Sequence, residues 1–148
     1  MENSRWGRHP FGRRQWVAPM ISLAALIPAG LATKSANGPG LAGWIHNHLG
    51  GLLYVTFFCL LFFPLFPRAR IATLAGGVLA ATCLLEFLQL WQPPFLTAIR
   101  GTTPGAMLLG TTFSPADFPH YLAGAILGGF WVHWLDRLGG DGKRDSTP

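Results

Sequence analysis

Charged side chains are scarce in this sequence. Asp, Glu, Lys and Arg make up only 11% of the 148 residues, whereas soluble domains carry roughly a quarter. Hydrophobic residues make up 50%. This composition argues against a soluble globular domain and favours a chain that spans a lipid bilayer.

Motifs that carry chemistry are also missing. The sequence has no nucleophile elbow, no phosphate-binding loop and no paired-cysteine metal site. The two cysteines, Cys59 and Cys83, fall inside apolar runs, so we interpret both as small buried hydrophobes and predict no disulfide framework. The histidines His46, His48 and His120 match no strong ligand spacing. We therefore predict no metal site, no cofactor and no defined catalytic residue.

Four apolar runs predict an all-α membrane protein with four transmembrane helices. The expected spans cover Trp16–Ala32, Leu49–Phe66, Ile71–Trp91 and Phe118–Leu135. A polar loop, residues 33–48, joins the first two spans.

The connection between the third and fourth spans contains the apolar segment PGAMLLGTTF. This segment is too short to cross a bilayer, so it predicts a short interfacial or re-entrant helix. Thr103 is the expected cap of this helix, and Pro104 suits its first turn. In the following segment, SPAD, Ser114 is the expected cap of the fourth span and Asp117 its acidic first-turn residue.

Basic residues predict the orientation of the chain. The N-terminus, the PRAR loop and the tail hold nine Lys and Arg, whereas the two other connections hold only Lys34 and Arg100. The positive-inside rule then predicts a bacterial-type cytoplasmic (inner) membrane protein with both termini in the cytoplasm. The expected parts are a basic N-terminus (1–15), a four-helix transmembrane domain (16–136) and a disordered tail (137–148). A cleaved signal peptide at the first span is the alternative.

A carboxylate lies inside the third apolar run. Glu86 is about five residues before Trp91, which places it roughly 7 to 8 Å below the expected interface. Gln89, three residues on, shares its helix face. Because Arg100 is the nearest cation in the sequence, we predict a Glu86–Arg100 pair. Such a pair either fixes the loop structurally or forms part of a substrate or ion site. The third interpretation is that Glu86 is unpaired and its side chain extends to water.

The start of the expected short helix is a candidate anion site. Free amide groups at a helix start attract anions, and Arg100 adds a positive charge beside Thr102. The other interpretation is a capped helix with an interfacial arginine. The predicted ligand-binding residues, all on the outer side, are Glu86, Gln89, Arg100, Thr102, Asp117 and Tyr121.

A pair of glycines predicts close helix packing on the fourth span. Gly124 and Gly128 form a GxxxG step on the face that also carries Asp117 and Tyr121. We expect this step to pack within the chain rather than to form a dimer, with Leu127 off the face.

The segments CLLEFLQL, PPFLTAIRGTTPGAMLLGTTF and ADFPHYLAGAILG resemble an integral-membrane family called domain of unknown function 2809, and more distantly the VanZ-like membrane proteins. The resemblance covers roughly Leu41 to Trp131 and implies an envelope setting without a defined reaction. The family often has an acidic residue early in the second span, where this sequence has Gly51. The residues that match its pattern are Glu86, Gln89, Arg100, Thr102, Gly105, Gly110, Asp117, Tyr121 and Gly124.

The expected function is binding of a polar or anionic envelope lipid or small ligand at the outer leaflet. Glu86 would accept hydrogen bonds, Gln89 would orient the ligand and Arg100 would hold an anionic headgroup. One alternative is a membrane enzyme acting on lipid-linked substrates, with Glu86 as general base. Another is an accessory or structural subunit that uses the GxxxG face. The expected partners are membrane lipids and either a second copy or a membrane complex; nucleic acid is not expected, because the basic clusters flank apolar segments.

Overall fold

The computed structural model describes residues 13–33, 35 and 38–141, and over these residues every regular element is a helix. The elements in chain order are α1 (Arg13–Thr33), α2 (Leu41–Trp44), the π-helical turn η1 (Ile45–Leu49), α3 (Gly50–Leu65), α4 (Ile71–Leu88), α5 (Pro94–Arg100), α6 (Thr103–Leu109) and α7 (Asp117–Asp141). The predicted all-helical fold is therefore confirmed. Two stretches, Trp16–Thr33 and Ile71–Leu88, are long and apolar enough to cross a membrane.

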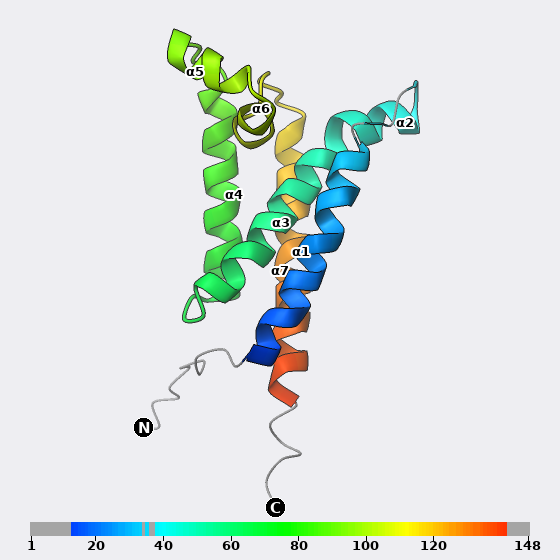
Figure 1. The fold of residues 1–148 in the computed structure, drawn as a ribbon, viewed down its shortest axis with the longest axis vertical. Coiled ribbons are helices and arrows are strands. Elements are labelled where there is room, and N and C mark those ends of the chain that lie inside the picture. The colour runs from blue at the N-terminus through cyan, green and yellow to red at the C-terminus, as the bar shows by residue number, and fades with distance from the viewer. Residues whose placement is uncertain (1–12, 34, 36–37, 142–148) are drawn as a thin grey trace, which may run out of the picture.

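The four long helices α1, α3, α4 and α7 alternate in direction (Figure 1). The elements α2, η1, α5 and α6 lie at one end of the molecule, which we call the upper end. The loop of residues 66–70, the start of α1 and the end of α7 lie at the opposite, lower end. Each predicted span thus coincides with one long helix.

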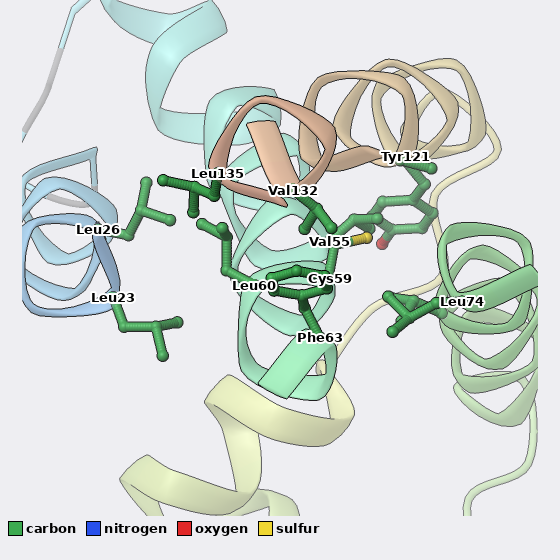
Figure 2. Packing of buried hydrophobic residues seen from close by; sticks show 12 residues of the cluster. Leu23, Leu26, Val55, Cys59, Leu60, Phe63, Leu74, Tyr121, Val132 and Leu135 are labelled. Atoms are coloured by element: carbon green, nitrogen blue, oxygen red, sulfur yellow. The ribbon is translucent and has the colours of Figure 1, made fainter. Parts of the chain in front are cut away.

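Helix α3 lies at the centre of the packing and contacts α1, α4 and, most extensively, α7. Figure 2 shows its side chains Val55, Cys59, Leu60 and Phe63 meeting leucines of α1 and α4 and apolar side chains of α7. Cys59 is a free, buried thiol, as expected, and Cys83 is free and partly buried. The hydrophobic core therefore contains side chains from all four long helices.

The glycine step of α7 faces α3. A Cβ built on Gly124 would lie 2.5 Å from the Leu52 carbonyl oxygen, and one on Gly128 would lie 2.8 Å from the Cβ of Cys59. Between them the Thr56 hydroxyl donates to the carbonyls of Leu52 and Gly124, at 3.0 and 3.1 Å. Small residues let two helix backbones approach closely. The face is occupied within the chain, so it does not offer a surface to another subunit.

Several boundaries differ from those expected. Residues 41–48, expected as loop, are helical and continue α3 upward through η1 and α2. Helix α4 ends at Leu88, and three i→i−3 backbone bonds then tighten the chain as far as Trp91. Helix α5 was not expected; it begins at Pro94, whose fixed φ suits a first turn.

Both ends of the helical region extend further than expected. Helix α1 begins at Arg13, inside the segment expected as a basic N-terminus. Helix α7 continues to Asp141, five residues into the expected disordered tail, because no proline lies between its first turn and that position. Residues 1–12 and 142–148 lie outside the described part.

Candidate functional site

Glu86 is buried at the upper end of α4, with an exposed fraction of 1%. Its Oε2 accepts hydrogen bonds from Gln89 Nε2 at 2.9 Å and from the Tyr121 hydroxyl at 2.6 Å. Its Oε1 accepts the backbone N–H of Ser114 at 2.6 Å. We call these four residues the Glu86 network. Because three donors meet one carboxyl group, Glu86 escapes the penalty of an unpaired buried polar group.

The ring of Tyr121 is held in place by a glycine of α3. A Cβ built on Gly51 would lie 2.8 Å from Tyr121 Cε1. A larger side chain there would displace the ring whose hydroxyl donates to Glu86.

Gln89 caps the C-terminal end of α4 and is 6% exposed. Its amide lies against Gly110, which has a φ of 68° and no room for a Cβ, since that atom would lie 2.7 Å from Gln89 Cδ. The Oε1 of Gln89 has no hydrogen-bond partner among the described residues. A buried amide oxygen in this state can still accept one donor.

The predicted Glu86–Arg100 pair is wrong. Arg100, at the end of α5, donates from Nη1 to the carbonyl of Trp91 at 3.0 Å and from Nη2 to the carbonyl of Leu88 at 2.9 Å. The carbonyls at the end of a helix lack intrahelical partners and carry partial negative charge, so a cation is favourable there. Glu86 obtains its donors elsewhere.

Arg100 is buried, at 7% exposed, and forms no ion pair with any described carboxylate. Its Nε also has no hydrogen-bond partner in the described part. Arg100 is the one Lys or Arg that the structure describes at the upper end, whereas Arg68, Arg70 and Arg137 lie at or near the lower end. The upper end therefore holds a single buried guanidinium without an anionic partner.

The two expected helix caps differ from those observed. Helix α6 is capped by Thr102, whose hydroxyl accepts the N–H of Gly105 at 3.2 Å, and Thr103 is its first residue. Pro104 does lie in the first turn. Ser114 does not cap α7, because the helix begins three residues later, at Asp117. The backbone N–H of Ser114 donates to Glu86 instead. The positions of these helix starts depend on local hydrogen bonds that cannot be read from the amino-acid sequence.

Asp117 belongs to a second cluster. Its Oδ1 lies 3.1 Å from Nδ1 of His48, which comes from η1. The rings of His48 and His120 are stacked, with centroids 4.5 Å apart and planes 9° from parallel. The side chain of His46 lies outside the described part. Sequence reasoning missed this cluster, although the Asp117–His120 spacing of three residues was a usable signal.

The Glu86 network has little scope for catalysis in this conformation. A general base must come within hydrogen-bond reach of a substrate proton, and the Glu86 carboxyl group is shielded from the surface. Two apolar grooves, one between α3 and α4 and one between α4 and α7, are lined by other residues. Sequence reasoning also missed Ser114, because its contribution is a backbone N–H.

Comparison with known proteins gives one result. A family model described as "Protein of unknown function (DUF2809)" matches residues 40–125, which include α2 to α6 and the start of α7. No curated protein and no solved structure matches the chain. The matched region covers more than half of the chain and contains every residue of the Glu86 network, Arg100 and Asp117. The chain therefore belongs to the DUF2809 family of proteins of unknown function.

Proposed function

We propose that this chain is a four-span membrane protein whose upper end holds an anionic ligand, the headgroup of an envelope lipid, at Arg100. The spans are α1, α3, α4 and α7. Helix α3 alone has 16 residues, but the helical stretch continues through η1 and α2. At 1.5 Å per residue, residues 41–65 then extend roughly 37 Å, enough for a hydrocarbon core of about 30 Å.

Exposed apolar side chains support the membrane setting. Such residues occur on all four long helices, including Ile21 on α1, Leu65 on α3, Leu84 on α4 and Phe130 on α7. A soluble monomer rarely exposes contiguous apolar surface on this scale. Hydrocarbon provides a favourable environment for these side chains, and the burial of Glu86 inside the bundle fits the same setting.

The observation that carries the ligand proposal is the buried Arg100 without a carboxylate partner. Its contacts with the carbonyls of Leu88 and Trp91 offset part of the charge, and Nε remains free to donate. Buried charges in proteins are normally paired. An anionic headgroup would supply the missing charge, and Gln89 Oε1 would accept a hydrogen bond from a headgroup hydroxyl or amine. Because Arg100 Nε and Gln89 Oε1 are both buried, this binding requires a local movement of the chain that exposes them.

The surroundings of Arg100 suit a lipid rather than a free anion. Helices α5 and α6 expose the apolar side chains of Phe95, Ile99, Met107 and Leu108, and Trp91 is exposed beside them. Short helices with exposed apolar and aromatic residues lie in the membrane interface, at the level of the headgroups. Acyl chains would cover these side chains while the headgroup meets the guanidinium.

Mass spectrometry of lipid that copurifies with the detergent-solubilised chain tests this proposal. We expect the parent chain to retain an anionic lipid, Arg100→Gln to lose it and Arg100→Lys to retain part of it. The matched control is Arg68→Gln, which removes an exposed arginine from the lower end. Retention of the lipid by Arg100→Gln would show that Arg100 only caps α4, and retention of a free anion instead would correct the ligand class.

The proposed location is a bacterial-type inner membrane with both termini in the cytoplasm, from the basic residues at the lower end. A reporter that is active only outside the cytoplasm should give signal when inserted at Ser114 and none at Arg68. The reverse pattern would place Arg100 on the cytoplasmic side.

A further inference from the structure

The upper end of the molecule also brings together two imidazoles and a carboxylate. His48 comes from η1, whereas Asp117 and His120 come from the first turn of α7. One ligand atom from each of the three side chains lies within 4.8 Å of the others. All three side chains are partly buried, so solvent and ions can reach them.

We infer that His48, Asp117 and His120 form a binding site for a divalent transition-metal ion, with Zn²⁺ as the preferred ion. Two imidazole nitrogens and one carboxylate oxygen are a common ligand set for Zn²⁺ and related first-row ions. Three protein ligands leave coordination positions for water or an anionic ligand. The site goes beyond the proposed headgroup function, because it uses none of the contacts of Arg100.

The hydrogen bonding of His120 prepares it as a ligand. Its Nδ1 lies 2.8 Å from the carbonyl oxygen of Ala116, one turn earlier. A carbonyl can only accept, so Nδ1 carries the proton and the lone pair of Nε2 is free for a metal. Metal-bound histidines usually donate from the second ring nitrogen in this way, which fixes the tautomer and the ring orientation.

The distances are compatible with coordination. Metal–ligand bonds of about 2.0–2.2 Å at tetrahedral angles place ligand atoms about 3.4 Å apart. The Nδ1 of His48 and the Oδ1 of Asp117 are already 3.1 Å apart. No ligand pair is more than 4.8 Å apart, so the ligand atoms must move closer by about 1.4 Å or less. Because the stacked rings hold their in-plane lone pairs in nearly parallel planes, the ring of His48 must also rotate before both imidazoles can point at one ion.

Two features of the sequence set this geometry. Asp117 and His120 are three residues apart, so they share one face of α7. His48 lies in the π-helical turn η1, and such turns occur frequently at functional sites because they re-aim side chains. Trp44 closes one side, with its ring centroid 5.5 Å from that of His120 and 6.3 Å from that of His48.

The competing explanation is structural. A hydrogen bond between His48 and Asp117, together with stacking on His120, would fix η1 against α7 without any ion. Zinc titration distinguishes the metal site from this structural explanation. The titration uses the full, untagged chain in detergent after a chelator has removed any bound metal. Calorimetry should find one Zn²⁺ per chain, and Co²⁺ should give the visible absorption bands of a protein-bound ion.

Variants then assign the ligands. We expect His48→Ala, Asp117→Ala and His120→Ala each to weaken Zn²⁺ binding by at least about 100-fold, the upper range for loss of a mere supporting residue. His133→Ala is the matched control, because His133 is exposed on the same helix about 20 Å further down. Parent-like affinity in all three variants, or an equal loss in His133→Ala, would overturn the inference.

A second measurement uses the parent chain, so its result does not depend on whether those variants fold. Bound Cu²⁺ should quench the fluorescence of Trp44 in the otherwise unchanged chain, because this ring contacts both histidines. Stoichiometric quenching should disappear in Trp44→Phe, whereas Zn²⁺ should protect the parent chain from it. Quenching that is unaffected by Trp44→Phe and by Zn²⁺ would place the ion elsewhere.

Discussion

Removal of the Tyr121 hydroxyl tests whether the Glu86 network stabilises the fold. In Tyr121→Phe the ring stays against Gly51, but the 2.6 Å hydrogen bond to Glu86 is lost. Hydrogen bonds to charged groups contribute about 1.5–3 kcal/mol in proteins, and those inside membrane proteins average about 0.6 with a maximum near 1.7. We therefore expect the free energy of unfolding to fall by about 1–2 kcal/mol.

The chain contains a matched control for this substitution, because Tyr54 is its only other tyrosine. The Tyr54 hydroxyl donates to the carbonyl of Leu108 at 2.9 Å in an exposed position. This bond lies at the surface and joins two neutral groups, so Tyr54→Phe should cost at most about 0.5 kcal/mol. Equilibrium unfolding by a denaturing detergent, followed by circular dichroism, measures both. Equal losses in the two variants would refute the stabilising role of the network.

The remaining predictions concern glycines and use the same unfolding measurement. Gly128→Leu should lose about 1–3 kcal/mol by overpacking against Cys59, whereas Leu127→Val, at a 42% exposed position, should stay within about 0.5 kcal/mol. A similar loss of unfolding free energy in both variants would show that the packing face does not contain Gly128. Gly110→Ala should lose more than about 1 kcal/mol, since its φ of 68° disfavours a Cβ and the facing amide leaves no space. Gly76→Ala, where a Cβ meets nothing within 4 Å, should be neutral or stabilising; a loss as large as that of Gly110→Ala would contradict the geometry.

The long helices were predictable because each contains a long apolar run that is followed by polar, charged or proline-containing sequence. The proximity of Glu86 and Gln89 also followed from their spacing on one helix turn, and the structure adds the hydrogen bond of 2.9 Å. These features depend only on local sequence. They need no knowledge of how the helices pack.

The partner of Arg100 was not predictable by matching opposite charges. The carbonyls of Leu88 and Trp91 lie at and just beyond the end of α4, and the short helix α5, which follows the break at Pro93, returns the guanidinium to them. Every residue has a backbone carbonyl, so the sequence does not indicate which carbonyls bind Arg100. A charge count therefore assigned Arg100 to Glu86, although the structure gives Glu86 three neutral donors.

The second cluster was missed for a different reason. His48 and Asp117 are 69 residues apart in sequence, and they meet only because α3 and α7 pack in one register. Gly124 and Gly128 set that register through their close approach to α3. The sequence indicated that these glycines pack against some helix, but not which helix or at what height. The histidines therefore could not be aligned with Asp117.

Binding of an anionic headgroup at Arg100 is tested most directly by the stability of the chain in lipid nanodiscs of defined headgroup. The parent chain should unfold at a higher temperature in anionic than in zwitterionic nanodiscs, since a ligand at about 100 times its Kd stabilises by about 2.7 kcal/mol. This difference should vanish in Arg100→Gln and persist in Arg68→Gln, whose side chain is exposed at the lower end. The same lipid dependence in Arg100→Gln as in the parent chain would contradict the proposal.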